Sequence, residues 1–244
     1  MSSIRTRRLK KAPEEATVLA LECSAGLASA AVMRDGDVLA MAEHAADHGH
    51  VAWLLPLAAE ALGAAGVERR ELDAVLAGRG PGSFTGIRVA LAAAKGLALA
   101  LGIPGYGLGS LASLAVSGRD GRRHVAALGD TRRRSLFVAG FTPDGASLGP
   151  IADLSVDAAT THLAAAAKDW IIIGHGAAEL ASRLEAIGVA ASVSPPSEAH
   201  ATHLLKSFAL MADVLPSDLP LEPLYLAPPI LGPSTGAAKE EKKG

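Results

Sequence analysis

The start of the chain alternates between short apolar runs and turn residues. Residues 17–24 (TVLALECS) and residues 27–33 are apolar runs of the length and composition that are typical of β-strands. The segment Arg34-Asp-Gly-Asp37 carries the Asp-Gly pair that favours a tight hairpin, and residues 38–42 form a third apolar run. This pattern predicts a three-stranded antiparallel meander.

Helical periodicity begins after the meander. In residues 51–65 apolar side chains recur every three or four positions, and Gly66 follows as a C-terminal cap. The further elements predicted in this half are a buried strand at residues 72–77, an apolar helix at about 85–101, a strand at 103–106 and a helix that begins at 109.

The second half repeats this order less clearly. Its predicted strands lie at residues 123–128, 135–141, 170–173 and 189–193, and its predicted helices at 156–167, 177–187 and 201–214. The order of elements matches two ribonuclease-H-like lobes of the actin/hexokinase superfamily, and it excludes an all-helical bundle and a pure β-sandwich. We therefore expect an α/β protein with a disordered basic tail at 1–16, lobes at 17–118 and 119–230, and a disordered tail at 231–244.

The composition limits the class of protein further. Of the 244 residues 50% are hydrophobic and 3% aromatic, so the core is built mainly from Ala, Leu, Val and Ile. A formal net charge of -2 argues against the broadly basic surface of many nucleic-acid binders. The single cysteine, Cys23, excludes an internal disulfide and a Cys-based zinc site. The nearest approach to a membrane span, residues 89–101, contains Lys95 and is too short, so we expect a cytoplasmic protein without membrane contact.

The segment between the strand at 72–77 and the next helix carries the most specific pattern of the sequence. Its residues are Gly78, Arg79, Gly80, Pro81, Gly82, Ser83, Phe84, Thr85, Gly86, Ile87 and Arg88. Glycines let backbone N–H groups approach an anion or a partner, Ser83 or Thr85 can cap the helix, and Arg88 lies in its first turn. This geometry suits a phosphate, a carboxylate or a partner chain, but a turn that needs glycine only for its shape explains the pattern equally well. The spacing matches neither a Walker phosphate loop nor the dinucleotide fingerprint.

This loop resembles, almost letter for letter, the signature of the TsaB (YeaZ-like) family of tRNA threonylcarbamoyladenosine biosynthesis proteins. The supporting segments are residues 19–24, Asp35-Gly36, His50 with residues 54–56, residues 95–100 and 102–104, and Tyr225-Leu226. The resemblance is strong over about residues 17–115 and loose in the C-terminal half.

The resemblance implies a role in a complex. Members of this family belong to the bacterial assembly that installs threonylcarbamoyl on the tRNA adenosine next to the anticodon. A TsaD-type subunit holds the metal and transfers the group, and a TsaE-type ATPase joins the pair. We therefore expect a non-catalytic partner subunit that dimerises with itself when alone and meets tRNA through the complex. It would need no cofactor or metal of its own, although ATP or ADP could lie at the interface of the complex.

Two departures from the family pattern bear on nucleotide binding. Glu22-Cys23-Ser24 stands where the family usually has Asp-Thr-Ser, and Tyr225-Leu-Ala-Pro228 lacks the arginine of Tyr-Leu-Arg-Pro. The alternative function is a self-standing actin-like ATPase or phosphotransferase, with Ser24, the Gly80–Gly86 loop and Asp130 around a Mg-nucleotide. Glu22 without a following Gly-Thr phosphate hairpin counts against that alternative.

Two polar clusters have two interpretations each. His44, His48 and His50, with Asp47 between them, could bind a metal, but we favour a polar loop before a helix because no remote carboxylate completes the set. Asp130 with residues 132–134 (three arginines) could touch tRNA phosphates, but we favour a solvated hairpin tip.

The two helices that flank the glycine-rich loop are the predicted partner surface. One apolar stripe comprises Val51, Leu54, Leu55, Ala58 and Leu62, and the other comprises Ala90, Ala93, Ala94, Leu97, Ala98 and Leu101. Part of each stripe must pack on the chain's own sheet. The 85–101 helix is apolar nearly all round, which favours a second chain on its other side.

Overall fold

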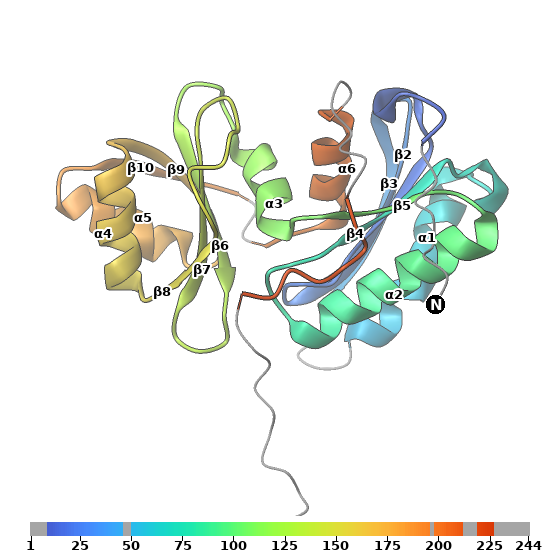
Figure 1. The fold of residues 1–244 in the computed structure, drawn as a ribbon, viewed down its shortest axis with the longest axis horizontal. Coiled ribbons are helices and arrows are strands. Elements are labelled where there is room, and N and C mark those ends of the chain that lie inside the picture. The colour runs from blue at the N-terminus through green and yellow to red at the C-terminus, as the bar shows by residue number, and fades with distance from the viewer. Residues whose placement is uncertain (1–8, 46–49, 196–197, 212–218, 227–244) are drawn as a thin grey trace, which may run out of the picture.

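The protein is described by a computed structural model, which covers residues 9–45, 50–195, 198–211 and 219–226. These residues form two lobes that lie side by side, each built on a five-stranded sheet (Figure 1). The elements of the first lobe are β1 (Val18–Glu22), β2 (Leu27–Arg34), β3 (Asp37–Ala45), α1 (Leu54–Ala65), β4 (Ala74–Gly78), α2 (Phe84–Leu101) and β5 (Gly105–Leu108), with short 3-10 helices at Pro13–Glu15, His50–Trp53 and Arg69–Glu71.

The first sheet confirms the predicted meander. Its strand order is β3-β2-β1-β4-β5, with β2 antiparallel to both neighbours and β4 and β5 parallel to β1. The turn between β2 and β3 places Asp35 and Gly36 at φ angles of 52° and 82°, in the left-handed region that the Asp-Gly pair tolerates.

The second sheet repeats the first. Its elements are β6 (His124–Asp130), β7 (Leu136–Phe141), β8 (Ala152–Leu154), α4 (Val156–Ala166), β9 (Asp169–Gly174), α5 (Ala177–Ala186) and β10 (Ala190–Ser194). The strand order β10-β9-β6-β7-β8 has the same pairing and the same directions, which confirms two ribonuclease-H-like lobes. The sequence did not predict β8, because three residues are too few to show a period.

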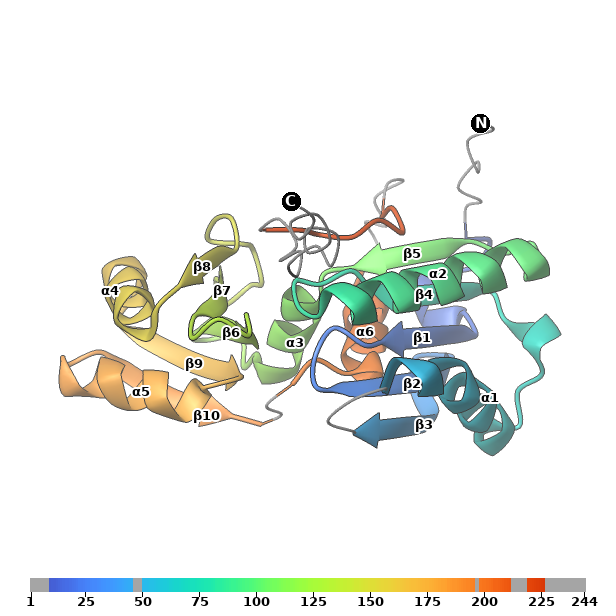
Figure 2. The same ribbon diagram turned by 90° about the horizontal axis from the view of Figure 1, so that it is seen from below.

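Two helices cross between the lobes. Helix α3 (Ser110–Gly118) follows the first lobe in sequence, yet its Leu111 and Leu114 pack on the second sheet. Helix α6 (Ala201–Ala209) follows the second lobe, yet its Leu204 and Phe208 pack on the first sheet. The helices lie between the two sheets in Figure 2. This packing corrects the predicted lobe ranges 17–118 and 119–230, since sequence order cannot show which sheet an apolar helix face covers.

The predicted N-terminal tail is partly ordered. Leu9 packs on the first lobe's core, and its N–H donates to Tyr106 Oη at 3.0 Å. Lys11 Nζ lies 2.8 Å from Asp73 Oδ2, and Ala16 is fully buried. The predicted tail of residues 1–16 is therefore wrong from residue 9 onward. Residues 1–8, the tail at 231–244 and residues 212–214 of the last predicted helix lie outside the described residues.

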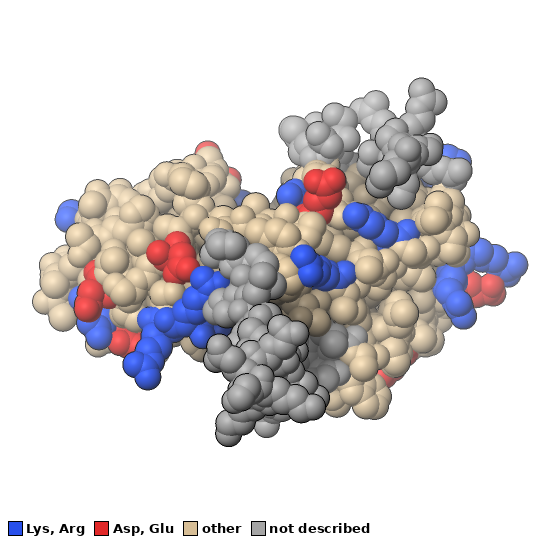
Figure 3. Space-filling view, turned by 60° about the horizontal axis from the view of Figure 1, so that its bottom comes forward, with Lys and Arg blue, Asp and Glu red and all other residues tan. Residues whose placement is uncertain are grey.

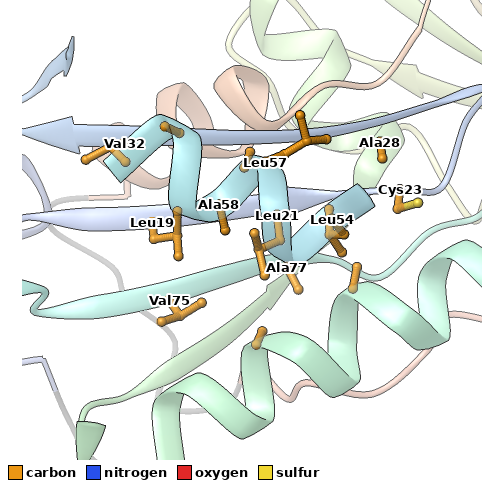
Figure 4. Packing of buried hydrophobic residues seen from close by; sticks show 14 of the residues in the cluster. Leu19, Leu21, Cys23, Ala28, Val32, Leu54, Leu57, Ala58, Val75 and Ala77 are labelled. Atoms are coloured by element: carbon orange, nitrogen blue, oxygen red, sulfur yellow. The ribbon is translucent and has the colours of Figure 1, made fainter. Parts of the chain in front are cut away.

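The stripes predicted to face a partner mostly turn inward. Figure 4 shows Leu54 and Ala58 of α1 pointing toward Leu21 and Ala77 of the sheet. The other stripe residues buried within the chain are Leu62 on α1 and Ala90, Ala94 and Ala98 on α2. Helical periodicity identifies an apolar side but not what covers it, and here the chain's own sheet does.

The outward sides of α1 and α2 keep apolar residues. Leu55 is 54% exposed and Leu99 is 71% exposed, while Leu97 is half-buried. The side chain of Val51 lies outside the described set. Among the described residues α2 is the one helix long and apolar enough to cross a membrane, with 18 residues and a mean hydropathy of 1.5, and core helices meet the same test. Only 28% of the residues of α2 are buried, so nothing in the described chain covers its outer side.

Histidines form the cap that begins α6. The Nδ1 atom of His200 accepts from the Thr202 N–H at 3.1 Å, and Nδ1 of His203 accepts from the His200 N–H at 3.0 Å. Burial lowers the pKa of both imidazoles, and the pKa of His203 falls to about 4. Glu43 lies 3.2 Å from Nε2 of His200 and partly offsets the lowering of that pKa. Both caps require neutral rings, because a protonated Nδ1 cannot accept.

Neighbouring leucines of α1 test the inward packing. We expect Leu54→Ala to lower the free energy of unfolding by about 2–5 kcal/mol, because it leaves a cavity in the core. Leu55→Ala, at the exposed next position, should change it by less than about 0.5 kcal/mol. Urea denaturation of both variants measures the difference, and equal effects would contradict the packing.

The capping histidine predicts acid sensitivity. The folded-state pKa of His203, about 4, lies below the reference value of 6.5, so the unfolded chain binds the proton first as the pH falls. The free energy of unfolding should therefore fall between about pH 6.5 and pH 4, by roughly 2–3 kcal/mol from this residue. We expect His203→Asn, whose amide oxygen can accept the same N–H, to flatten this slope in urea denaturation across that range. His162→Asn, at an exposed histidine, should leave the slope as in the wild type.

Candidate functional site

The two lobes enclose a pocket of about 180 Å³ at the carboxyl ends of their central strands. The lining residues come from both lobes: Ser24, Ala25, Gly26, Pro81, Gly82, Ser83, Leu111, Leu128, Gly129, Asp130, Arg132, His175, Glu198 and Ala199. The fold thus brings together Ser24, part of the glycine-rich loop and Asp130, the three groups that the sequence suggested for a nucleotide. His175 and Glu198 were not predicted, because nothing in their local sequence marks them.

Three glycines of the loop pack on three consecutive residues at the end of β1. A Cβ at Gly78 would lie 2.0 Å from Glu22 Oε2, and a Cβ at Gly86 would lie 1.8 Å from the Cys23 carbonyl oxygen. A Cβ at Gly82 would lie 2.1 Å from the Ser24 carbonyl oxygen. All three distances are far shorter than any side chain allows. The glycines are therefore needed for close contact between the loop and residues 22–24.

Three N–H groups of the loop have partners inside the chain. The Ser83 N–H donates to the Ser24 carbonyl oxygen at 2.7 Å, and the Gly80 N–H donates to Ser110 Oγ at 3.2 Å. The Gly86 N–H donates to Ser83 Oγ at 3.2 Å, which identifies Ser83 rather than Thr85 as the helix cap. An anion cradle needs free N–H groups. The N–H groups of Gly80, Ser83 and Gly86 are not free for one, which fits a turn shaped by glycine.

Glu22 is a buried carboxylate that the chain uses internally. It is fully buried, and Oε1 accepts from the N–H groups of Cys23 at 2.9 Å and Ser24 at 2.7 Å. The Ser110 hydroxyl donates to Oε2 at 2.8 Å. Burial raises the pKa of Glu22 and outweighs these hydrogen bonds, which lower it. Because Ser110 begins α3, the carboxylate joins β1 of the first lobe to a helix of the second.

Arg88 does not line the pocket. Its guanidinium carbon lies 3.6 Å from the centroid of the Phe84 ring, and Nε donates to Tyr225 Oη at 2.8 Å. The Tyr225 ring stacks on Phe84 with centroids 5.2 Å apart. The Leu224 N–H donates to the Arg79 carbonyl oxygen at 2.8 Å, so residues 224–225 lie over the start of the loop. No sequence pattern could have predicted this pairing of distant segments.

The pocket is small, and its two carboxylates are engaged within the chain. Its volume is below the roughly 300–1,000 Å³ of sites for larger ligands. Asp130 Oδ1 accepts from the Arg132 N–H at 2.7 Å, and Asp130 Oδ2 lies 3.2 Å from Arg132 Nε. Glu198 Oε2 accepts from the Gly26 N–H at 3.1 Å. Both carboxylates of the pocket therefore accept hydrogen bonds within the chain.

The predicted histidine cluster is only partly described. The ring of His44 packs on Trp53 with centroids 4.5 Å apart, as in a structural aromatic contact. Asp47, His48 and the side chain of His50 lie outside the described residues. Within the described part of the chain no group of three His, Cys, Asp or Glu side chains could hold a metal ion.

Comparisons with known proteins point to one family. Residues 42–202 match the family described as TsaD: tRNA N6-adenosine threonylcarbamoyltransferase. The chain is 32% identical over 129 residues to the tRNA threonylcarbamoyladenosine biosynthesis protein TsaB of Escherichia coli, an alignment that covers 52% of this chain and 55% of that protein. It is also 32% identical over 143 residues to an uncharacterized protein of Mycobacterium tuberculosis, covering 58% of this chain and 66% of that protein.

A solved structure covers more of the chain. The structure titled as YeaZ from Pseudomonas aeruginosa aligns with a TM-score of 0.67 and 30% sequence identity, over 86% of this chain and 100% of that chain. The agreement extends through both lobes, whereas the sequence alignments span only 55% and 66% of the two relatives above.

Two glycines of α2 test the close contact. We expect Gly86→Ala to lower the free energy of unfolding by several kcal/mol or to prevent folding, because its Cβ would overlap the Cys23 carbonyl oxygen. Gly96→Ala, where nothing lies within 4 Å, should raise it by about 0.5–1 kcal/mol, because alanine is the better helix former. Denaturation curves and soluble yield measure both, and a Gly86→Ala variant as stable as the wild type would contradict the contact.

Proposed function

The chain belongs to the TsaB (YeaZ-like) family, and we propose from this premise that it is a non-catalytic subunit of the complex that forms threonylcarbamoyladenosine in tRNA. In this proposal a TsaD-type subunit carries out the transfer, and the chain supports that subunit in the cytoplasm. The relatives named for this pathway support the assignment.

One observation supports the non-catalytic role: the carboxylates of the pocket and three N–H groups of the loop make contacts within the chain. Three glycines of the loop press against Glu22-Cys23-Ser24, and the pocket beside them measures about 180 Å³. Asp130 and Glu198 accept hydrogen bonds from their own chain. A subunit without its own cofactor leaves the chemistry to a partner.

The outward sides of α1 and α2 are the surface that this proposal assigns to a partner. Trp53 is exposed just before α1, and Leu55 is exposed in its first turn. Leu99 is the most exposed large apolar residue of α2. Ala92, Gly96 and Ala100 are exposed on α2 as well, and such small residues let another helix approach closely. A TsaD-type subunit would cover this surface, and a second copy would cover it when the chain is alone.

The remaining parts of the proposal concern the assembled complex. A TsaE-type ATPase joins the pair, ATP or ADP lies at the interface rather than within this chain, and tRNA is reached through the complex. These parts rest on the family membership. The small volume of the chain's own pocket supports placing the nucleotide at the interface.

The alternative function is a self-standing actin-like ATPase or phosphotransferase. It is favoured by one observation: Ser24, residues 82–83 of the loop and Asp130 line one pocket between the lobes. The pocket's volume and its engaged carboxylates count against this alternative.

Co-purification tests the partner surface. We expect the wild-type chain to co-purify with a co-expressed TsaD-type subunit, and Leu99→Glu to reduce recovery at least about tenfold, because it buries a charge at an apolar contact. Ile187→Glu, at a 57% exposed apolar position that follows α5, should leave recovery unchanged. Failure of the wild type to recover the transferase would contradict the proposal, and equal recovery with Leu99→Glu would place the interface elsewhere.

Calorimetry distinguishes the two functions. We expect the isolated chain to show no binding heat on titration with Mg-ATP, while the complex transfers threonylcarbamoyl to tRNA. Micromolar binding by the isolated chain would favour the ATPase or phosphotransferase. Transfer to tRNA that proceeds equally well without this chain would contradict a supporting role.

A further inference from the structure

The turn between β6 and β7 displays three consecutive arginines. Arg132, Arg133 and Arg134 are all exposed. The φ angles of Arg132 and Arg134 are both 62°, in the left-handed region that residues other than glycine, asparagine and aspartate rarely occupy. A turn of this shape would usually use glycine, so arginine at these positions is not explained by the backbone.

Short polar side chains hold this turn in place. The Arg132 N–H donates to Asp130 Oδ1 at 2.7 Å, and the Arg133 N–H donates to Thr131 Oγ1 at 3.1 Å. The Thr131 hydroxyl in turn donates to the Ser135 carbonyl oxygen at 3.0 Å. The fold of the turn therefore depends on backbone groups and on Asp130 and Thr131, not on the guanidinium groups.

The guanidinium groups of the turn are largely unused. Arg132 pairs with Asp130 on the surface, with Nε 3.2 Å from Oδ2. Within the described residues no hydrogen bond or ion pair involves the guanidinium group of Arg133 or Arg134. Exposed guanidinium groups are well suited to phosphate oxygens, which they bind through paired hydrogen bonds.

The arginines at the other end of β6 provide the contrast. Arg123 Nε lies 2.8 Å from Asp120 Oδ2, and its Nη1 donates to Ser192 Oγ at 2.7 Å. Arg119 Nη2 donates to the Pro143 carbonyl oxygen at 3.1 Å. These side chains hold the fold together, whereas those of the β6–β7 turn contribute little to it.

The turn lies where a large ligand of the complex could reach it. Arg132 lines the pocket between the lobes together with Ser83 of the glycine-rich loop, so the turn stands beside the start of α2. Figure 3, in which the bottom of Figure 1 comes forward, shows Lys and Arg side chains projecting together from the lower end of the second lobe. In Figure 1 the β6–β7 turn lies at that end. The chain's net charge of -2 makes this a local basic feature rather than a general one.

Resting on the proposed function, we propose that the β6–β7 turn contacts phosphates of the tRNA backbone in the assembled complex. The contact carries no sequence information, because phosphates are the same along the strand. Its role is to orient the tRNA relative to the transferring subunit. Arg133 and Arg134 supply charges that have no other partner in the described chain, and Arg132 can exchange Asp130 for a phosphate.

The test is tRNA binding by the complex of this chain with the TsaD-type subunit, measured by fluorescence anisotropy at several salt concentrations. We expect Arg133→Glu to weaken binding roughly tenfold or more at fixed salt. The slope of log K against log salt should become shallower by about 1, because one phosphate contact is lost. Arg134→Gly, which removes a guanidinium group and suits the left-handed backbone, should act in the same direction.

Arg122→Glu is the matched control. Arg122 is exposed at the opposite end of β6, and its N–H donates to Asp120 Oδ1 at 2.9 Å in the way that the Arg133 N–H donates to Thr131. This variant should bind tRNA with the wild-type affinity and slope. An equal loss with Arg122→Glu would indicate a general effect of charge and would overturn the assignment to the turn.

The other outcomes separate this inference from the proposed function. Wild-type affinity and slope in both Arg133→Glu and Arg134→Gly would overturn the phosphate contact and leave the subunit role intact. Loss of the TsaD-type subunit from Arg133→Glu during purification would assign the turn to a protein contact and overturn the inference. A wild-type complex that binds no tRNA would contradict both.

Discussion

The structure depends on the contact between the end of β1 and the glycine-rich loop. Glu22, Cys23 and Ser24 occupy space that any Cβ at Gly78, Gly86 or Gly82 would fill. The same contact buries the Glu22 carboxylate, which then needs the Ser110 hydroxyl and two backbone N–H groups as partners. Because Ser110 starts the helix that packs on the second sheet, a local steric requirement also sets how the two lobes meet.

This contact occupies part of the junction between the two lobes. The N–H groups of Gly80, Ser83 and Gly86 donate to oxygens of the chain itself, and that of Gly80 reaches Ser110 of α3. The pocket that remains between the lobes is small, and its carboxylates are engaged by backbone donors. What the fold leaves available lies on the outside, on the apolar outer side of α2 and on the arginine turn of the second lobe. Both features suit a subunit that acts through larger partners.

Much of the architecture was predictable because it follows from local patterns. The Asp-Gly pair with positive φ angles at Asp35 and Gly36 determines the first hairpin, and Gly66 ends α1 in the left-handed conformation that was expected. Element order then led to two ribonuclease-H-like lobes, which the repeated strand order confirms. The errors were of another kind. The sequence did not show that α3 and α6 each pack on the other lobe, or that the apolar stripes of α1 and α2 face the chain's own sheet. Both depend on which surfaces meet after the chain has folded.

The sequence by itself determined the elements, the repeated sheet order and the importance of the loop at residues 78–88. Turn residues, helix caps and hydrophobic periodicity depend only on residues that are close in the sequence. Only the tertiary structure decided what the loop does. Ser24 and Asp130 are 106 positions apart, and their place beside Gly82 and Ser83 depends on how two lobes pack. The same holds for Arg88, which meets Tyr225 rather than an anion. A glycine allows close approach, but the residue that approaches comes from elsewhere in the chain, and no local pattern encodes it.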